Sequence, residues 1–597
     1  MVPDFSTGRE SRFVPDNSSG GNPADIEVRA PAALKAFAPP GPGNFLFEEV
    51  AGDIERGVFS RSICTRFPPE PNGYLHLGHA RAIMANVGVA RKFEGLFNFR
   101  LDDTNPVTES LEFELAIKRD LEWLTGLSVS DRTFHASGYF ERLYSSAIKL
   151  IEIGLAYVDD VSPVDLRKNR GSYFETGRAT PCRDRDVEEN LQIFESMRKG
   201  IYQPGEKVLR AKIDLSHPNM NMRDPIIYRI VNASHHRAGA WNIYPMYDFA
   251  HPLSDAFEGV THSICGKEFE NHRPLYNWFL EKLGVQEPPR QIEFAELKIP
   301  GVVLGKRYIK RLIEKGHVTG WDDPRLHTLR GLRRRGVPSE AIRDFCDNLG
   351  VSKAESRVDL AALDYATRQY LNRTAQRAMV VLKPLRVIID NYPAGTEELL
   401  DAANNPEDKN SGRRKLLFGA EIYIDRDDFM EEPTADFYRL SPGREVRLRH
   451  GYRIRCVGFE KEAGSGDLTA LHVVYDPSSL GLVRERGKKS ATLHWVSVAD
   501  AVPVEVRLFN ELFSAEVDKI TAAQKIESFL AADSIQTVRA MAEPSLAAVS
   551  PGQRFQFERV GYFCVDQDSE SAGYPIFNRT VTIKDAFVRK ITQASRE

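Results

Sequence analysis

Apolar residues in the first part of the chain recur with two different spacings. Residues 62–67 (Ser-Ile-Cys-Thr-Arg-Phe) are expected to form a buried strand, and the Pro-Pro-Glu-Pro-Asn-Gly segment at 68–73 would end it. Between about residues 78 and 90 the apolar positions follow helical periodicity, and residues 96–101 form a second strand-like run. Strand, helix and strand in close succession predict a βαβ unit and therefore a parallel sheet. A short amphipathic helix is expected just before this unit, from Asn44.

Outside this βαβ unit, the residue patterns divide the chain into further regions. Residues 137–246 mix helical and strand patterns and look like an insertion, whereas residues 307–375 are rich in helical patterns and basic side chains. The N-terminal residues 1–43 are rich in Gly, Pro, Ser and Asn, which predicts a disordered tail. A chain of 597 residues has room for roughly four domains. Short β-type runs typical of antiparallel barrels recur at 386–389, 445–449, 471–475, 504–508 and 579–583.

Composition narrows the class of protein. The formal net charge is −4, so any binding of nucleic acid must use local basic patches such as residues 306–311 or 333–335. Judged from charge alone, these basic clusters are more typical of solvated helix faces than of nucleic-acid-binding patches. The six cysteines include no Cys-x-x-Cys spacing, which excludes a zinc ribbon and favours a reducing compartment. With no apolar run of membrane-spanning length and no secretory segment near its start, the chain is expected to be cytoplasmic.

The strongest chemical motif is His76-Leu-Gly-His79, at the predicted junction between the first strand and its helix. Ligands bind beyond the carboxyl ends of parallel strands, and helix N-termini favour phosphate. Two imidazoles three residues apart can face one side and donate hydrogen bonds to a phosphoryl group that gains negative charge. Gly78 has no Cβ, so a flat base could approach the backbone closely. Taken alone, this four-residue motif could also arise by chance, with His76 and His79 as two ordinary histidines near the start of a helix.

The residues around this motif carry a family resemblance. Residues 65–79 (Thr-Arg-Phe-Pro-Pro-Glu-Pro-Asn-Gly-Tyr-Leu-His-Leu-Gly-His) resemble the HIGH signature region of the glutaminyl-tRNA synthetases, which belong to class I of the aminoacyl-tRNA synthetases. So many matching segments in the family's order, from about residue 45 to 590, make chance similarity an inadequate explanation. The further segments are 101–106, 244–249, 321–325, 331–336, 377–379, 494–497, 555–559 and 577–581.

The resemblance implies a fold and a division into domains. We expect an α/β fold with a Rossmann-type parallel-sheet catalytic domain, an acceptor-stem-binding insertion, a helical connector and two C-terminal antiparallel β-barrels. The expected ranges are 1–43 for the disordered tail, 44–136 and 247–296 for the two halves of the catalytic domain, 137–246 for the insertion, 297–375 for the lysine loop and helical connector, and 376–597 for the two anticodon-binding barrels.

The resemblance also implies a glutamine pocket. Asp102 follows the second strand, where a carboxylate could pair with a substrate ammonium, although it could instead cap the next helix. A glutamine amide both donates and accepts hydrogen bonds, so neutral partners suffice. Glutamyl relatives place an arginine where Cys265 stands, so a thiol there favours the amide; packing in the core is its alternative role. The expected glutamine-binding residues are Arg66, Asp102, Tyr247, His251, Cys265 and Gln291.

Residues 303–307 resemble the Met-Ser-Lys form of the family's flexible KMSKS loop, whose lysine neutralises the phosphates of ATP. Lys306 matches that lysine, although the segment alone could be a basic turn before a helix. Leu304 and Gly305 depart from the family pattern, and Glu296 stands where relatives often carry a basic residue. The expected catalytic residues are His76, His79 and Lys306, and the expected ATP-binding residues are Pro69, Glu70, Asn72, His76, Gly78, His79, Val303, Leu304 and Lys306.

Five further residues match positions that bind tRNA in relatives, four at the anticodon and one at the acceptor stem. Arginine and glutamine offer donors suited to splayed-out bases. Each of them could singly be an ordinary polar surface residue. Asp436 and Tyr438 differ from the bacterial form of the family, and Asn271 occupies an aspartate position, so the finer contacts there stay open. The expected tRNA-binding residues are Asn271, Arg377, Arg439, Gln556 and Arg559.

The resemblance implies a two-step ligase reaction. The glutamine carboxylate attacks the α-phosphate of ATP, and the adenylate then passes the glutaminyl group to the 3′-terminal adenosine of tRNA(Gln), releasing AMP and pyrophosphate. Relatives need bound tRNA for the first step. We expect Mg²⁺ with ATP, no protein-bound metal, no membrane contact and a monomer whose partners are tRNA(Gln), L-glutamine and ATP.

Three alternatives remain, of which only the silent paralogue belongs to a different functional class. A glutamyl-tRNA synthetase is disfavoured by Cys265, and a catalytically silent tRNA-binding paralogue is suggested only by Gly305 and Glu296. A small nucleotidyltransferase would share the His-x-Gly-His turn but lack the distant lysine loop and about 300 C-terminal residues.

Overall fold

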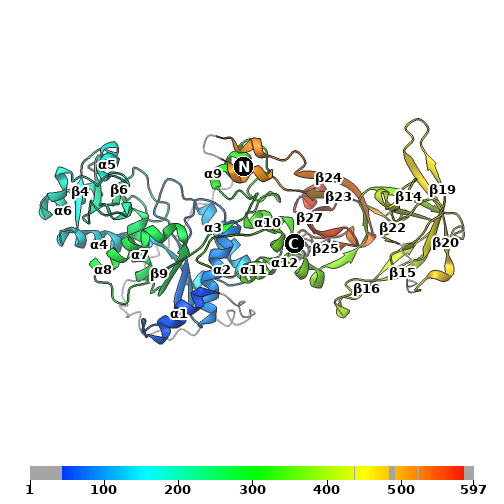
Figure 1. Cartoon of the computed structure of the whole chain (residues 1–597), viewed down its shortest axis with the longest axis horizontal. Helices are drawn as coiled ribbons and strands as arrows, with labels where there is room; N and C mark the ends of the chain where they lie inside the picture. The colour runs from blue at the N-terminus through cyan, green and yellow to red at the C-terminus, as the bar shows by residue number, and fades with distance from the viewer. Residues whose placement is uncertain (1–43, 436, 483–490, 521–523, 584–597) are drawn as a thin grey trace, which may run out of the picture.

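The computed structural model describes residues 44–435, 437–482, 491–520 and 524–583 of the 597-residue chain. The molecule is elongated, with an α/β region at one end and β-sheet regions at the other (Figure 1). The predicted disordered tail at 1–43 lies outside the described residues, so its disorder stays a prediction. The expected first helix is present as α1 (Phe45–Glu55), which begins where Asn44 Oδ1 accepts a hydrogen bond from Leu46 N at 3.1 Å.

A parallel sheet forms the centre of the α/β region. Strands β1, β2 and β3 are parallel in that order, with Cys64 opposite Leu96. Strands β8 and β9 form a second parallel pair, which adjoins β1 because Thr261 N donates to Cys64 O at 2.9 Å. β1 and most of β2 are buried, and this includes their polar side chains Thr65, Arg66, Asn98 and Arg100. The elements are β1 (Cys64–Phe67), α2 (Leu77–Lys92), β2 (Leu96–Leu101), α3 (Leu111–Thr125), β3 (Thr133–His135), β8 (His262–Gly266), α8 (Arg273–Lys282) and β9 (Arg290–Phe294).

Between β3 and β8 the chain forms an antiparallel sheet in the order β4-β5-β6-β7. The rings of Tyr144 and Phe194 stack in its core, which continues into α7 and α8 through Phe249 and Phe279. The core therefore extends past the expected boundary at residue 246, because α7 packs with the insertion. The elements are α4 (Phe140–Glu152), β4 (Ala156–Asp159), α5 (Pro163–Arg170), α6 (Val187–Arg198), β5 (Val208–Ala211), β6 (Ile226–Ile230), β7 (Ile243–Pro245) and α7 (Tyr247–Phe257).

The expected helical connector follows β9. Leu332, Phe345 and Leu363 from α10, α11 and α12 share one apolar core with α2 and α3. Helix α9 instead packs on apolar residues within 512–517 and 526–529, which come from far along the chain. The helix that begins at the lysine loop is therefore supported by the C-terminal region. The elements are β10 (Leu297–Lys298), α9 (Lys306–Glu314), α10 (Leu329–Arg335), α11 (Ser339–Leu349), β11 (Ser356–Arg357) and α12 (Ala361–Thr374).

Two seven-stranded sheets that curl into barrel-like units form the far end (Figure 1). The proximal unit has the order β12-β25-β26-β27-β23-β24-β13 and the distal unit the order β21-β18-β19-β20-β14-β17-β22. Because β12 and β13 precede the distal strands and the other proximal strands follow them, the units are interleaved along the chain. The distal strands are β14 (Pro384–Ile389), β17 (Glu421–Asp425), β18 (Glu445–Leu448), β19 (Arg453–Lys461), β20 (Leu468–Asp476), β21 (Thr492–Leu493) and β22 (Trp495–Ser497), beside the hairpin β15 (Glu398–Ala403) and β16 (Arg413–Phe418); the proximal strands are β12 (Gln376–Ala378), β13 (Val380–Val381), β23 (Val502–Phe509), β24 (Ile535–Ala542), β25 (Arg554–Phe557), β26 (Gly561–Val565) and β27 (Ile576–Thr582), with α13 (Asp568–Ala572) before the last.

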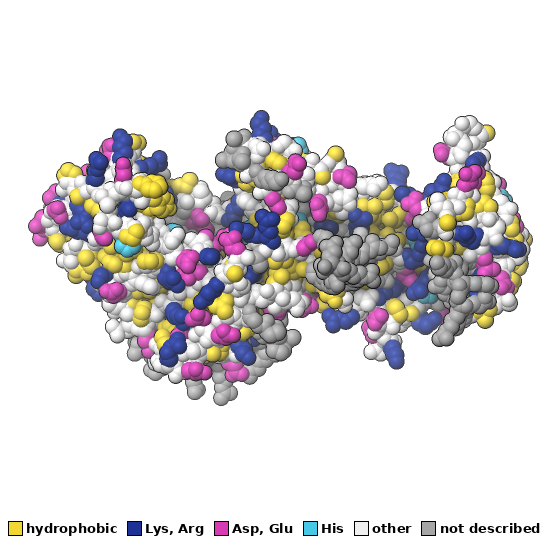
Figure 2. Space-filling model, in the orientation of Figure 1, with side chains coloured by type: hydrophobic (Ala, Val, Ile, Leu, Met, Phe, Trp, Pro, Cys, Tyr) yellow, Lys and Arg dark blue, Asp and Glu magenta, His cyan; other side chains and the backbone are white. Residues whose placement is uncertain are grey.

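The fold class predicted from the sequence is confirmed. The five predicted β-runs coincide with β14, β18, β20, β23 and β27, although Arg449 and Ile583 lie one residue past β18 and β27, and β1 begins at Cys64, two residues later than predicted. Figure 2 shows Lys and Arg intermingled with Asp and Glu over the visible face, as the net charge of −4 implied. Within the described ranges no helix combines the length and the apolar character needed to cross a bilayer.

Candidate active site and RNA-binding residues

A cavity of about 530 Å³ opens at the carboxyl ends of β1 and β2. Its wall includes five of the six predicted glutamine-binding residues: Arg66, Asp102, Tyr247, His251 and Cys265. The sixth, Gln291, is buried in β9, where its Nε2 donates to Phe269 O at 3.1 Å and to Glu293 Oε1 at 2.9 Å. Gln291 therefore supports Phe269, which lines the cavity, and is not itself among the described lining residues.

Asp102 presents a charged carboxylate to this cavity. Burial by itself would raise its pKa, but the Arg100 guanidinium, whose Nε donates to Asp102 Oδ1 at 2.7 Å, and His251 together hold the pKa below its usual range. The alternative role as a helix cap is wrong, because Ser110 Oγ accepts from Phe113 N and caps α3. The carboxylate is therefore ionised and available to a ligand cation.

Arg100 was missed by the sequence reasoning, although a signal was present. Side chains two apart on a strand share a face, so Arg100 and Asp102 had to point to the same side of β2. The Arg100 guanidinium also reaches Asp255 Oδ1 at 2.7 Å and Glu258 Oε2 at 3.3 Å. Because these contacts hold the Arg100 guanidinium in place, Arg100 in turn orients the Asp102 carboxylate.

The other predicted glutamine-binding residues of the cavity carry less free charge than their residue types suggest. Arg66 lines the cavity, but its Nε donates to Asp255 at 3.1 Å, and its other nitrogens contact Ile264 O, Ser263 Oγ and the His251 ring. The Tyr247 ring stacks on His251 at 4.9 Å. Burial raises the pKa of the Cys265 thiol far above its usual range, so the thiol is neutral. A ligand side chain would meet a paired arginine, a thiol and aromatic rings there.

The two histidines of the His-Leu-Gly-His motif are positioned by the start of α2. His76 Nδ1 accepts from Gly78 N at 3.1 Å, and His79 Nδ1 accepts from His76 N at 3.1 Å. Burial lowers the pKa of His76 to about 4 and that of His79 well below its usual range, so both rings are neutral near pH 7. A neutral ring that accepts through Nδ1 carries its proton on Nε2. Both residues therefore offer an Nε2–H donor.

The lysine loop meets this motif across more than two hundred residues of sequence. Lys306 is the first residue of α9, and its Nζ donates to Asn72 Oδ1. Its side chain lies against Gly73, where a Cβ would come within 2.8 Å of Lys306 Cδ. Leu304 Cδ1 lies 3.6 Å from the position of a Cβ on Gly78. Burial lowers the pKa of Lys306, while Glu70 opposes this change.

The structure therefore brings the predicted ATP-binding residues into one region. Asn72, His76 and Gly78 lie under the lysine loop, Pro69, Glu70 and His79 also line the cavity, and Val303 packs with the apolar cluster that holds α9. Burial raises the pKa of Glu70, an effect that the nearby Lys306 reduces. No group of three or more His, Cys, Asp or Glu side chains within the described ranges could hold a metal ion.

A pair of carboxylates near this region was also missed. Glu268 lines the cavity and lies so close over Gly266 that any Cβ there would collide with it. Burial, and the neighbouring carboxylate of Glu296, raise the pKa of Glu268. Glu296, one of the departures from the family pattern, thus adds negative charge beside the cavity.

The predicted tRNA-binding residues occupy three separate places. Asn271 is exposed in the turn before α8, where its backbone oxygen accepts from the side chains of Asn219 at 2.7 Å and Asn221 at 3.2 Å. Arg559 in the proximal unit donates through two nitrogens to Asp428 of the distal unit at 2.7 and 3.0 Å, and Arg439 reaches the same carboxylate at 3.1 Å. Tyr438 is exposed, and Asp436 lies outside the described residues.

Arg377 and Gln556 are register partners between β12 and β25. Arg377 is buried and donates to Ala375 O at 2.6 Å and to Asn372 O at 2.8 Å, near the end of α12. Gln556 Nε2 donates to Tyr562 OH at 2.8 Å. Reading of a base by either residue would require these internal hydrogen bonds to be exchanged, and their role at the anticodon stays a prediction.

Comparison with known proteins agrees with this architecture. Residues 62–373 match the family described as tRNA synthetases class I (E and Q), catalytic domain, and residues 375–476 and 492–566 match anti-codon binding domains of the same description. The catalytic match covers more than half of the chain. The chain therefore belongs to the class I tRNA synthetases of the E and Q type.

Several curated relatives that are about 50% identical to this chain are named Glutamine--tRNA ligase. The Glutamine--tRNA ligase of Nitrobacter hamburgensis is 50% identical over 92% of this chain and 97% of its own length. Those of Bradyrhizobium diazoefficiens and Pseudomonas syringae pv. tomato are 48% and 47% identical, over 92% and 95% of this chain and 98% and 99% of their own. A solved glutamate-tRNA synthetase from Elizabethkingia anophelis is 21% identical and superposes with a TM-score of 0.40 over 53% of this chain and 72% of its own.

Proposed function

We propose that this chain is a glutamine–tRNA ligase, which uses ATP to activate L-glutamine and attaches it to the 3′-terminal adenosine of tRNA(Gln). One observation carries the choice of amino acid. Cys265 contributes a neutral thiol to the cavity, and Arg66, which also lines it, is already paired with Asp255. A glutamine side chain can be bound there without an unpaired cation, whereas a glutamate side chain would need one. The name shared by relatives of about 50% identity supports the same choice.

In the proposed complex Asp102 pairs with the ammonium of glutamine. Arg100 fixes the carboxylate, and the charge of Asp102 is maintained near pH 7 by that contact. The aromatic rings of Tyr247 and Phe269 contact each other, with centroids 5.5 Å apart, and would together form an apolar wall beside the side chain of the substrate.

Activation uses ATP, accompanied by Mg²⁺ as part of the substrate. As the glutamine carboxylate attacks the α-phosphate, negative charge moves onto the departing pyrophosphate. The Nε2–H groups of His76 and His79 and the ammonium of Lys306 are the donors that would stabilise this charge. The transition state thus gains hydrogen bonds from groups that are already oriented, and no protein nucleophile is required.

Transfer requires the end of a tRNA in the same cavity. We propose that Asn271 contacts the acceptor stem and that Arg377, Arg439, Gln556 and Arg559 contribute to anticodon binding. We further propose a monomer that works in the cytoplasm. The six cysteines, all free and far apart in sequence, fit a reducing compartment.

The test is charging of glutamine and glutamate, side by side, onto purified tRNA with a CUG or UUG anticodon. We expect glutamine to be charged and glutamate to be charged far more slowly. Preferential charging of glutamate would make the chain a glutamyl-tRNA synthetase. Binding of tRNA without charging of either amino acid would support the silent paralogue.

A further inference from the structure

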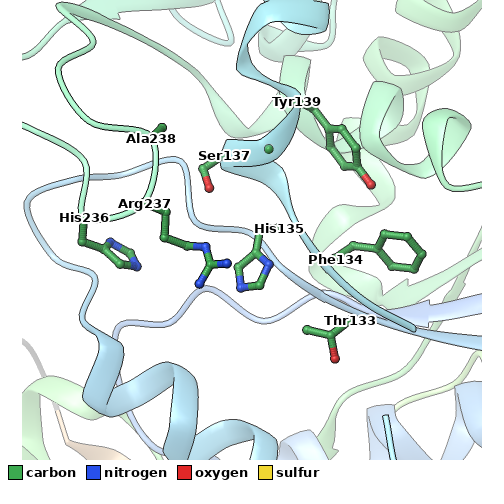
Figure 3. A pocket seen from close by; sticks show the side chains of 9 residues that line it. Thr133, Phe134, His135, Ser137, Tyr139, His236, Arg237 and Ala238 are labelled. Atoms are coloured by element: carbon green, nitrogen blue, oxygen red, sulfur yellow. The ribbon is translucent and has the colours of Figure 1, made fainter. Parts of the chain in front are cut away.

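Cavities outside the catalytic site also contain arginine side chains, and they differ in how those arginines are paired. One cavity, of about 660 Å³, places Arg237 beside His135 and His236 (Figure 3). Glu114 accepts hydrogen bonds from Arg237 NH1 at 3.3 Å and from His135 Nε2 at 2.9 Å, so this cationic group already has a carboxylate partner within the protein. Another cavity, of about 380 Å³, contains arginines without such a partner.

This smaller cavity lies between the helical connector and the proximal unit, and we call it the connector pocket. Helix α10 supplies Arg330, Arg333 and Arg334, which are three and four positions apart and therefore share one face of the helix. The opposite wall comes from the turn before β25 and from β26. The other lining residues are Asp322, Pro551, Gly552, Cys564, Val565 and Gln567.

Hydrogen bonds fix α10 to the proximal unit. Arg334 donates through two nitrogens to both carboxylate oxygens of Asp566 at 3.0 Å, and Arg335 Nε donates to Thr580 O at 3.2 Å. Arg334 NH1 also donates to Asp322 at 3.2 Å, so the acidic lining residue is paired as well. The two walls of the pocket are therefore held apart by the fold itself, and two of the three arginines in the basic patch at 333–335 are bound inside the protein.

The remaining two arginines of the pocket are not paired in this way. Within the part of the chain that the structure describes, neither Arg330 nor Arg333 forms a hydrogen bond or an ion pair through its guanidinium. Their contacts are with aromatic rings, since Arg330 lies 4.7 Å from the ring centre of Tyr74 and Arg333 lies 5.6 Å from that of Trp123. Burial raises the pKa of Asp120 to about 7, although both arginines act to lower it, so this carboxyl group compensates the two cations only in part near pH 7.

The free donors and the size of the pocket fit a compact ligand with more than one phosphate. Guanidinium groups bind phosphate oxygens through pairs of parallel N–H donors, and contact with an aromatic ring leaves those donors unused. Residues three apart on a helix have Cβ atoms about 5–6 Å apart, so Arg330 and Arg333 can each reach one of two neighbouring phosphate groups. The volume lies within the range of about 300–1,000 Å³ that is usual for small-molecule sites.

We propose that the connector pocket binds a small molecule that carries two adjacent phosphate groups, with the phosphates at Arg330 and Arg333. Inorganic pyrophosphate and a nucleoside diphosphate share this chemistry. Because α10 and β26 wall the pocket on two sides, a compact ligand suits it better than the backbone of an RNA. Pro551 and Val565 provide an apolar surface beside the phosphates, which a nucleoside could also contact.

The test is isothermal titration of the full-length protein with inorganic pyrophosphate, GDP and inorganic phosphate. The double variant Arg330→Gln/Arg333→Gln is compared with Arg373→Gln, which removes an exposed arginine of α12 outside the pocket. We expect pyrophosphate to bind wild type more tightly than phosphate does, and the double substitution to weaken its binding roughly 10- to 100-fold. Arg373→Gln should bind as wild type, and unchanged thermal unfolding should show that each variant is folded. Equal affinity for GDP and pyrophosphate would identify a nucleotide ligand, whereas binding of pyrophosphate alone would identify an inorganic one.

Crystallography locates the anion directly. Crystals soaked in tungstate, a heavy oxyanion, should show anomalous density beside Arg330 and Arg333. Density only elsewhere, or pyrophosphate binding that the double substitution leaves unchanged, overturns the proposal. If tRNA displaces pyrophosphate and the double substitution raises the KM for tRNA, the two arginines bind RNA backbone, and the proposal is likewise wrong. Charging of glutamine is measured separately, so a wild type that charges no tRNA would refute the proposed function and not this site.

Discussion

Gly305 is the departure from the family pattern whose effect can be worked out from the structure. It is the N-cap residue of α9, and no side chain caps that helix. Its backbone angles, φ −66° and ψ 117°, are open to any residue, so a serine would fit without backbone strain. A side chain added at Gly305 would meet one neighbour, since its Cβ would lie 3.0 Å from Tyr308 Cδ2.

The expected gain from Gly305→Ser has two parts. Replacing glycine where the backbone is compatible stabilises the ordered state by about 0.4–1 kcal/mol, because the disordered state loses freedom. A serine cap adds only a few tenths of a kcal/mol relative to glycine. The close contact with Tyr308 subtracts from this sum. The net gain is therefore up to about 1 kcal/mol, which is roughly a fivefold increase in the population of the ordered loop.

The assay is tRNA-dependent ATP–pyrophosphate exchange across a titration of Mg²⁺–ATP. We expect an active wild type, a loop that is mobile without ATP, and an exchange rate for Gly305→Ser that is unchanged or up to about fivefold higher. Gly305→Ala is the matched control, because it restricts the backbone without adding a cap. A Gly305→Ser rate well below wild type would refute the reasoning, since the contact with Tyr308 would then dominate. A wild type without exchange that Gly305→Ser restores would favour the silent paralogue.

Four further outcomes are expected. Lys306→Ala should slow exchange roughly 100- to 1,000-fold while tRNA still binds. If this variant exchanges at the wild-type rate, the assignment of Lys306 to the ATP-binding loop is wrong. Cys265→Arg should abolish glutamine charging, because the guanidinium and the substrate NH₂ group are both hydrogen-bond donors and would face each other. Unchanged kinetics would show that Cys265 does not contact the substrate side chain. Asp102→Asn should raise the glutamine KM roughly 10- to 100-fold, and a change in thermal stability alone would contradict its binding role. Arg377→Ala should reduce charging by about 1–3 kcal/mol in an anticodon-dependent way. If the loss is the same for every anticodon and Tm falls, the contact with the end of α12 is its only role.

Local features of the active site could be predicted from the sequence because they depend on neighbouring residues. The apolar spacing predicted β1, α2 and β2, and their succession predicted a parallel sheet. The position of His76 at the start of α2 followed from the same pattern, and its role as the cap of that helix is a local hydrogen bond. The family resemblance then supplied the residues of the cavity, five of which line it.

Long-range contacts could not be predicted in this way. No pattern in the chain shows that Lys306 reaches Asn72, that Asp428 binds Arg439 and Arg559 together, or that the loop carrying His235 is tied to Asp103. Side-chain direction was equally hidden. The Gln291 side chain donates to Phe269 O inside the protein, because a buried polar group forms a hydrogen bond with whichever partner the fold places beside it.

The sequence by itself thus determined the fold class, the family and the residue types available for chemistry. The tertiary structure decided which of these residues meet, and whether a charged group faces the cavity or is paired inside the protein. Arg66 and Asp102 illustrate the difference, because both line the same cavity and both are ion-paired. The Arg66 guanidinium is enclosed by Asp255, Ser263 and a backbone oxygen, whereas Asp102 follows the carboxyl end of β2, with one oxygen held by Arg100 and the other 3.3 Å from His251 Nδ1. Periodicity records burial along one element, but the partners of a buried charge come from several elements, and only packing brings them together.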